Sequence, residues 1–300
     1  MYLFSKKETL IQNITFMAIM AAINIVISVI STLMGAVVPI VSVFFIIILP
    51  LTSTVVTLFC KNRYYPIYAV ATIGLSMVAT MWNMEYTIFY VVPSIITGFI
   101  FGLLSKKKVN GIYSIAIAAF LQTGITYALI PLLNVIYGTN FIETAKALFN
   151  VGPESYVNYF IPTIIFAISL IQVGLSYIVI ANEIRKMNIE PAQNIKNNWV
   201  LPLISVGFLF IALGFTFRYL SGAFVTIFIS LYFTVASLVV FIKSKLIPSL
   251  IVLGGSVILS IILFAVFYPL INEPTSFVLI GLFPLTNNIS TIIVSFLIKK

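Results

Sequence analysis

The feature that most limits the possible folds of this chain is a succession of long, uncharged hydrophobic segments. The first covers residues 11–33 and contains no charged side chain over 23 residues. A helix of that length can cross a hydrocarbon core of about 30 Å. Over the whole chain, 61% of the residues are hydrophobic and 8% are charged, whereas soluble domains typically carry about 25% charged residues. We therefore expect an all-α, polytopic membrane protein.

The hydrophobic pattern predicts ten transmembrane spans, joined mostly by short connections. They cover residues 11–33, 39–60, 66–83, 86–104, 109–136, 157–181, 199–217, 222–242, 247–268 and 276–298. Only Asn83, Met84 and Glu85 separate the third span from the fourth. A single re-entrant hairpin is the alternative there, but two spans with a tight turn agree better with the basic residues on either side.

The distribution of basic residues predicts how the spans are oriented. On the ten-span map, 14 of the 16 Lys and Arg residues fall on one side, and Lys146 and Arg218 are the exceptions. The positive-inside rule assigns the basic side to the cytoplasm, so both termini and residues 183–198 are expected there, in a protein of the cell membrane. The first span has no cleavage site after it and is expected to remain in the mature protein. The net charge of +9 is explained by topology, and no nucleic-acid partner is needed.

Residue types that are missing from the chain exclude most enzyme classes. There is no histidine, no aspartate, and one cysteine, Cys60. Zinc sites, histidine-based triads and intramolecular disulfides therefore have no residues to form them. No phosphate-binding motif of the G-x-x-x-x-G-K-[ST] or G-x-G-x-x-G type occurs. We expect no enzymatic activity, no cofactor and no metal site.

Polar and aromatic residues gather at the predicted outer ends of spans three to six. The candidate substrate-binding residues are Trp82, Asn83, Glu85, Tyr86, Tyr90, Asn134, Tyr137, Tyr156 and Asn158. Such rings, amides and one carboxylate could line an outward pocket for a planar or polar small molecule. They could equally form an ordinary aromatic belt at the membrane interface. Glu85 is the member that a belt explains least well.

The loop over residues 139–150 is predicted to contain a short amphipathic helix. Asn140 can act as its N-cap, with Glu143 as the capping-box partner three residues later. Such a helix could lie on the membrane surface, or it could close over a cavity as a lid. Both interpretations remain open at this point.

A polar segment with an internal proline is the best candidate for a boundary between units. It covers residues 183–198 and contains Pro191. The prediction is a six-helix membrane unit over residues 1–182, a cytoplasmic linker over 183–198, and a four-helix membrane unit over 199–300.

Several residues within the spans are expected to serve helix packing. Buried amides usually hydrogen-bond across helices, and small residues let helices approach closely. The amides are Asn24, Gln122 and Gln172, and the glycines are Gly98 with Gly102 and Gly254 with Gly255.

The first span carries small residues on one face. Ala18 and Ala22 are four residues apart and therefore stack on one side of a helix, with Ala21 beside them. This pattern, six spans ending near residue 182, and the outer polar cluster resemble the substrate-binding S-components of energy-coupling-factor transporters. The resemblance implies that the alanine face docks on a transmembrane coupling subunit, and that two cytoplasmic ATPases supply the energy. The missing ATP motif agrees with that division of labour.

The resemblance covers residues 11–182, and the four remaining spans depart from the usual six-helix unit. The chain is more similar to bacterial membrane proteins of about this length that have an S-component-like core and extra C-terminal helices, a group with no established substrate. The leading hypothesis is capture of a small solute from the outer face for uptake. The alternatives are a membrane scaffold or envelope-assembly factor, and a self-contained carrier or lipid flippase. Any of these functions places the chain in a lipid bilayer.

Overall fold

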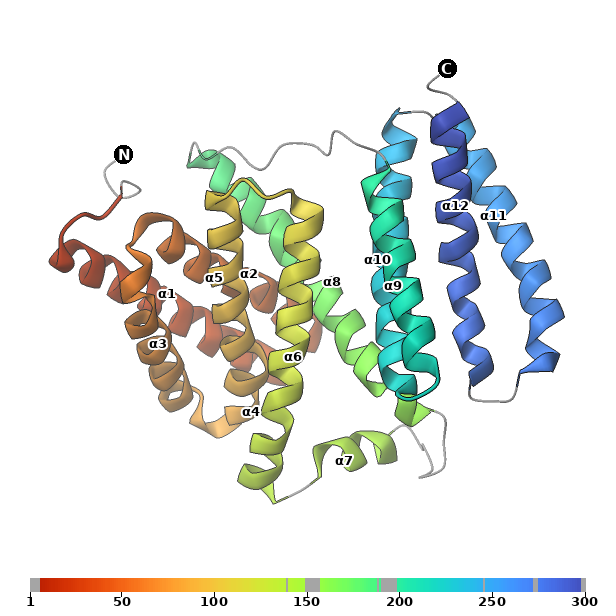
Figure 1. Ribbon diagram of the computed structural model, residues 1–300. Helices are drawn as coiled ribbons and strands as arrows, with labels where there is room; N and C mark the ends of the chain where they lie inside the picture. Colours follow the sequence, from red (N-terminus) through yellow and green to blue (C-terminus); the bar gives the residue numbers. More distant parts are fainter. Residues whose placement is uncertain are drawn as a thin grey trace. The chain divides into compact units, whose positions relative to one another are not determined.

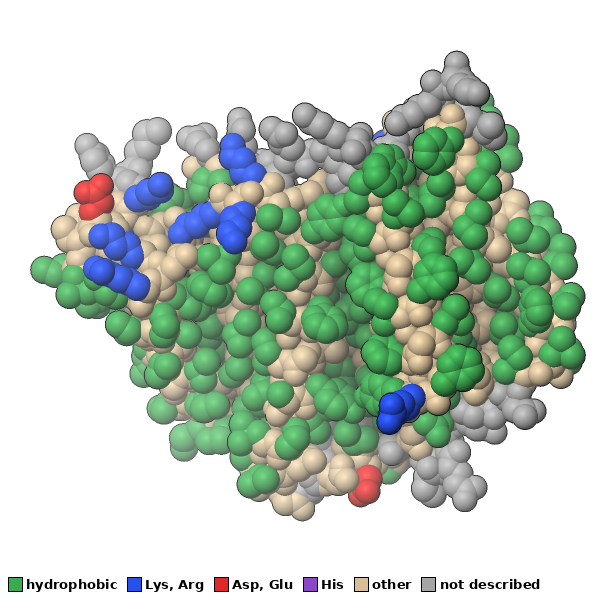
Figure 2. Space-filling view, in the orientation of Figure 1, with side chains coloured by type: hydrophobic (Ala, Val, Ile, Leu, Met, Phe, Trp, Pro, Cys, Tyr) green, Lys and Arg blue, Asp and Glu red, His purple; other side chains and the backbone are tan. Residues whose placement is uncertain are grey.

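The computed structural model describes residues 6–138, 140–148, 157–187, 189, 199–244, 246–271 and 275–297. Within these ranges the chain is helical and contains no β-strand (Figure 1). Eight of the described helices are long and apolar enough to cross a membrane. Hydrophobic side chains make up much of the face of the molecule that Figure 2 shows. The protein is an all-α, multi-pass membrane protein, which confirms the predicted class.

The helices follow the predicted spans, with short irregular turns between some of them. The long helices are α1 (Leu10–Val37), α2 (Pro39–Phe59), α3 (Tyr65–Ala79), α5 (Val92–Lys106), α6 (Gly111–Tyr137), α8 (Val157–Lys186), α9 (Val200–Thr216), α10 (Leu220–Ser244), α11 (Leu246–Phe267) and α12 (Leu282–Leu297). The short elements are η2 (Asn62–Tyr64), η3 (Met81–Asn83), α4 (Met84–Tyr86), η4 (Thr87–Val91), α7 (Phe141–Leu148), η5 (Tyr268–Leu270) and η6 (Thr275–Gly281).

Two of the ten predicted spans correspond to helical runs shorter than a typical transmembrane helix, whereas α5 and α12 belong to longer runs, Met81–Lys106 and Thr275–Phe296, that include the short elements before them. Helix α3 has 15 residues and α9 has 17, which correspond to about 22 Å and about 26 Å of length. A hydrocarbon core of about 30 Å normally takes some 20 residues. Eight membrane-spanning helices are therefore supported, and the count of ten stays a prediction.

Local capping explains where two of the helices begin. Thr9 and Gln12 form a capping box at the start of α1, in which each side chain accepts the other residue's backbone N–H at 3.3 Å. At α7, the Asn140 side chain accepts the backbone N–H of Glu143 at 3.4 Å. The predicted helix in the 139–150 loop and its N-cap are thus confirmed. Its function as a lid stays a prediction.

The described chain forms two compact units. Unit 1 consists of Met1–Lys146 and Ile168–Gln193, and unit 2 consists of Ala147–Ala167 and Asn194–Lys300. Helix α8 begins in unit 2 and ends in unit 1. The predicted division into 1–182 and 199–300 around a linker stays a prediction, because residues 190–198 lie outside the described residues.

Close packing of α2 against α5 organises unit 1, and Gly98 and Gly102 make it possible. A Cβ atom on Gly98 would overlap the Pro50 carbonyl oxygen and the Ser53 side chain, and one on Gly102 would overlap Thr57. The predicted packing function of this glycine pair is confirmed. In unit 2 the same prediction is wrong for Gly254 and Gly255, because nothing described lies within 4 Å of a Cβ built on either.

The amides predicted to join helices do so in unit 1. Asn24 on α1 donates to the Leu49 carbonyl oxygen at 3.2 Å and to Thr52 Oγ1 at 2.6 Å, both on α2. Gln122 on α6 accepts from Thr97 of α5 at 2.9 Å and donates to Gln172 of α8 at 2.8 Å. Hydrogen bonds of this kind hold helices together in a bilayer, where no hydrophobic force drives their association.

Helices α9, α10, α11 and α12 form most of unit 2. Leu209, Ala212, Phe224 and Ile227 make a buried apolar cluster between α9 and α10. Asn288 of α12 donates to Ser205 of α9 and to Thr234 of α10, both at 2.8 Å. One amide therefore connects three helices.

Candidate functional site

The connection between α3 and α5 contains most of the residues that the sequence predicts to bind substrate. Here the chain passes through η3, α4 and the π-helical turn η4 (Figure 1). Asn83 accepts the backbone N–H of Tyr86 at 3.4 Å and so caps α4. The rings of Tyr86 and Tyr90 lie with their centroids 5.2 Å apart. π-Helical turns are rare and occur frequently at functional sites. We call Trp82, Asn83, Glu85, Tyr86 and Tyr90 the hairpin cluster.

The hairpin cluster has an exposed part and a buried part. The Trp82 side chain is 60% exposed, and Asn83 and Glu85 are also exposed. Tyr86, in contrast, is only 6% exposed. The exposed part has the composition of an interfacial belt, whereas the buried tyrosine carries a polar group into the interior. Sequence reasoning treated the cluster as one surface.

The remaining predicted substrate residues are distributed more widely. Asn134 is half-buried and Tyr137 exposed near the C-terminal end of α6, and α6 contacts η4. Asn158 is half-buried at the start of α8 and belongs to unit 2. Tyr156 lies outside the described residues. The structure therefore brings five of the nine predicted residues together in one short connection.

A row of buried hydroxyl groups on α3 was missed by sequence reasoning. Tyr68, Thr72, Ser76 and Thr80 follow one another at intervals of four residues, and each is at most 1% exposed. The signal was present in the sequence, because side chains four apart share one face of a helix. Helix α3 contacts α1 and η4, so this polar face is directed into unit 1.

Hydrogen bonds extend the row of hydroxyls to neighbouring helices. Tyr68 donates to Thr52 Oγ1 at 3.1 Å, and Thr52 also accepts the Asn24 amide. At the other end, the hydroxyls of Thr80 and Thr87 are 2.6 Å apart. We define the polar seam as Asn24, Thr52, Tyr68, Thr72, Ser76, Thr80 and Thr87.

Part of this polar interior lacks hydrogen-bond partners. The buried hydroxyls of Thr72, Ser76 and Tyr86 have no partner in hydrogen-bond geometry within the described chain, although Tyr68 lies beside Thr72 and Ser31 beside Tyr86. An unsatisfied buried polar group typically costs about 1–3 kcal/mol, and native interiors contain few of them. The oxygens of Thr72 and Ser76 are donors and acceptors available to a polar molecule that reaches the seam, and the Tyr86 hydroxyl is a further polar group buried in the hairpin cluster.

The alanine face of α1 is divided between an inner and an outer side. Ala21 is 5% exposed and packs within unit 1, whereas Ala18 and Ala22 are exposed. Exposed small residues four apart leave a shallow surface that another helix can approach closely. The structure thus places Ala18 and Ala22 where a second protein could contact them.

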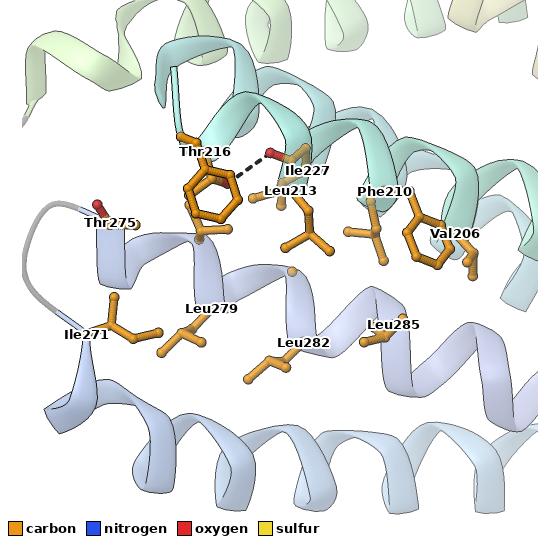
Figure 3. A pocket seen from close by; sticks show the side chains of 15 residues that line it. Val206, Phe210, Leu213, Thr216, Ile227, Ile271, Thr275, Leu279, Leu282 and Leu285 are labelled. Atoms are coloured by element: carbon orange, nitrogen blue, oxygen red, sulfur yellow. Dashed lines mark hydrogen bonds between the residues drawn. The ribbon is translucent and has the colours of Figure 1, made fainter. Parts of the chain in front are cut away.

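Unit 2 contains an apolar pocket of about 500 Å³ between α9, α10 and the η6–α12 segment. Figure 3 shows Phe210 and Leu213 of α9 facing Leu279 and Leu282 across the pocket, with Thr216 beside its end. The Thr216 hydroxyl donates to the Ala212 carbonyl oxygen at 2.9 Å. The remaining lining residues except Thr275 are apolar, so the pocket offers a largely hydrocarbon surface.

The described residues contain no cluster of three or more His, Cys, Asp or Glu side chains that could hold a metal ion. The chain has no significant match among protein-family models, functionally characterised proteins or solved structures. Its function is therefore argued from the site itself.

Proposed function

We propose that this membrane protein binds a small polar solute in unit 1 for uptake, without chemical conversion of the solute. The observation that carries the proposal is the polar seam, in which the hydroxyls of Thr72 and Ser76 have no hydrogen-bond partner within the described chain. The seam begins at the hairpin cluster through the Thr80–Thr87 hydrogen bond. A solute with several hydroxyl, amide or carbonyl groups could satisfy these oxygens as it enters.

Binding at the seam requires a local opening of the helices, because Thr72 and Ser76 are fully buried. The break at η3, α4 and η4 supplies a place for that movement. Hinges are short segments that absorb backbone rotation at the ends of helices, and a π-helical turn is a position where helix geometry already departs from the regular pattern. Glu85, exposed at this break, is proposed to contact the solute on entry.

We further propose that a separate membrane subunit linked to cytoplasmic ATPases drives uptake, and that it docks on Ala18 and Ala22. The exposure of both alanines supports this assignment. The chain itself has no ATP-binding motif of a familiar type. If no ATPase-linked subunit co-purifies with the unmodified protein, this part of the proposal fails while solute binding remains to be judged by its own test.

The proposed orientation has both termini, and residues 183–198, in the cytoplasm of a ten-span protein in the cell membrane. The uneven distribution of Lys and Arg supports it. Reporter fusions after Lys107, Gln193 and Lys300 should all report a cytoplasmic location. A fusion that reports the outside at any of the three would contradict the ten-span map.

The test of solute binding is a ligand-dependent thermal shift of the purified protein, screened with small polar solutes and vitamins. A ligand that binds only the folded form raises its melting temperature. For a solute that binds, Glu85→Gln and Ser76→Ala should each lower the affinity roughly tenfold. This is the equivalent of one hydrogen bond to a buried or charged group. Their melting temperatures without solute should change little.

Two matched variants serve as controls in this experiment. Glu183→Gln removes a carboxylate that pairs with Lys186 at 2.5 Å near the end of α8, and Ser28→Ala removes a buried hydroxyl that bonds to its own helix at Asn24. Both should keep the full ligand shift. Equal shifts in Glu85→Gln and the unmodified protein would assign Glu85 to the membrane interface. If no solute raises the melting temperature, the alternative function as a membrane scaffold would be favoured.

The apolar pocket of unit 2 favours a second candidate function, the handling of a membrane lipid. Its hydrocarbon lining suits one acyl chain. Arg218, in the link between α9 and α10 next to the pocket residue Phe217, offers a cation for the lipid phosphate. Filling the pocket by Leu279→Trp should reduce phospholipid retained in native mass spectrometry, whereas Ile258→Trp at an exposed position of α11 should not. Equal retention in both variants would exclude this function.

A further inference from the structure

A basic recess lies at one end of unit 1. None of its lining residues belongs to the hairpin cluster. It has a volume of about 1080 Å³. Figure 2 shows the Lys and Arg side chains of unit 1 gathered at this end. The recess is lined by Lys6, Lys7, Lys61, Lys106 and Lys108, with Glu8 as the one acidic side chain. These lysines come from the segment before α1, the end of α2, the end of α5 and the turn after it.

The backbone around the recess is held by a specific set of hydrogen bonds. The Lys7 N–H donates to the Phe59 carbonyl oxygen at 2.9 Å, which ties the N-terminal segment to the end of α2. Buried Asn13 donates to the Lys7 carbonyl oxygen at 3.1 Å and accepts the Lys61 N–H at 2.8 Å. The lysines therefore project from a fixed frame, unlike basic residues in a loose tail.

Two of the lysine ammonium groups of the recess donate hydrogen bonds to neutral oxygens. Lys61 donates to the Glu8 carbonyl oxygen at 2.7 Å, and Lys106 donates to the Asn62 side-chain oxygen at 3.0 Å. Lys6 lies close enough to Lys106 to repel it. Neutral partners orient these groups but leave their positive charge uncompensated.

The positive-inside rule explains why these lysines lie on one side of the membrane, but not why five of them line a single recess. Helix C-termini attract cations because each carries about half a negative charge, and α2 and α5 both end here. These ends and Glu8 offset only part of the charge of the five lysines. The recess therefore keeps a net positive charge, at the mouth of a cavity of about 1080 Å³.

We propose that this recess binds a phosphate group. Lysine is a common ligand of compact phosphates because its ammonium is a point charge with three donors. Several lysines converging from different segments can contact several oxygens of one phosphate at once. Two sources supply such a group: an anionic lipid headgroup of the adjacent leaflet and a soluble phosphate compound. The proposal is independent of solute binding in unit 1.

The test uses the full-length protein and two probes that distinguish these sources. Sodium pyrophosphate is added to the protein in detergent, and phosphatidic acid is supplied in phosphatidylcholine nanodiscs, with nanodiscs of phosphatidylcholine alone as reference. Thermal shift and native mass spectrometry report binding. Stabilisation by pyrophosphate assigns a soluble ligand, and stabilisation by phosphatidic acid alone assigns the lipid headgroup. In both cases high salt should weaken binding, because salt screens partly exposed charges.

Lys107 provides a matched control, because it lies between two lysines of the recess but does not line it. Lys106→Gln should weaken binding roughly fivefold, as expected for one partly exposed charge contact. Lys107→Gln, with the same change in net charge, should leave it unchanged. Lys108→Asn gives a second variant suited to the left-handed backbone there, with φ of 53°. Equal weakening by the Lys106 and Lys107 variants, or stabilisation by neither probe, would overturn the proposal.

Discussion

Thr80 and Thr87 are joined by a hydrogen bond of 2.6 Å between their side-chain hydroxyls. Six residues lie between them, and these form η3 and α4. Both side chains are completely buried. The bond connects the end of α3 to the first residue of the π-helical turn and closes the polar seam beneath the exposed residues of the hairpin cluster.

Replacing either threonine by valine should destabilise the protein. Thr80→Val or Thr87→Val keeps the shape but leaves the other hydroxyl with one partner fewer, and we expect a loss of about 1 kcal/mol for each. The double variant should lose less than the sum of the two, because it removes both groups of the pair. Thermal or denaturant unfolding in detergent measures this as a double-mutant cycle. Strict additivity would show that the two hydroxyls do not interact.

Adding one methyl group between α2 and α5 should also be costly. Gly98→Ala and Gly102→Ala place a Cβ against Pro50 or Thr57, where no space exists. Overpacking of this kind typically costs about 1–3 kcal/mol. Gly124→Ala on α6, where the new methyl meets nothing within 4 Å, should be neutral or slightly stabilising, since alanine favours helix by about 1 kcal/mol over glycine. Melting temperatures that fall equally in all three variants would contradict the α2–α5 contact.

The Cys60 thiol should react slowly at neutral pH. Burial raises the pKa of Cys60 to about 11, although the nearby Lys7 and Lys106 charges act in the opposite direction. Because the thiolate is the nucleophile, iodoacetamide labelling of the folded protein should increase as the pH approaches 11. The denatured protein should label near the ordinary thiol pKa of about 8.5. A variant with Cys60→Ala and Asn62→Cys, which moves the thiol to an exposed position, should label readily in the folded state.

The same shift predicts how stability depends on pH. The thiol ionises more easily in the unfolded chain than in the folded one, so its contribution to stability is complete below about pH 8.5. This contribution should be lost progressively as the pH rises toward 11. Cys60→Ala should therefore lose less stability than the unmodified protein between pH 8.5 and pH 10. Parallel unfolding curves in that interval would contradict the raised pKa.

A larger residue on the exposed alanine face of α1 should disturb a partner complex without disturbing the fold. Ala22→Leu adds bulk at an exposed position, so the melting temperature of the isolated protein should stay the same. At a close-packed contact the extra atoms would cost about 1–3 kcal/mol, and the amount of co-purifying coupling subunit should fall. Ala36→Leu, an exposed alanine several turns along the same helix, is the control. A fall in melting temperature for Ala22→Leu alone would indicate an internal contact.

The sequence by itself determined that this chain is an all-α membrane protein, because long uncharged segments have no stable place in water. It also determined local features: the Asn140 cap depends on residues a few positions apart, and Asn24 or Gln122 in an apolar span has few alternatives to a bond with another helix. Tertiary structure decided which face of each helix lies inside. In α3 the spacing places the hydroxyls of Thr72 and Ser76 on one face, but only the packing against α1 and η4 shows that this face is buried. Tertiary structure also decided which glycines lie at close helix contacts. A Cβ on Gly98 would overlap a neighbouring backbone, whereas one on Gly254 would contact nothing within 4 Å. The presence of a glycine in the sequence does not show how closely another helix approaches it.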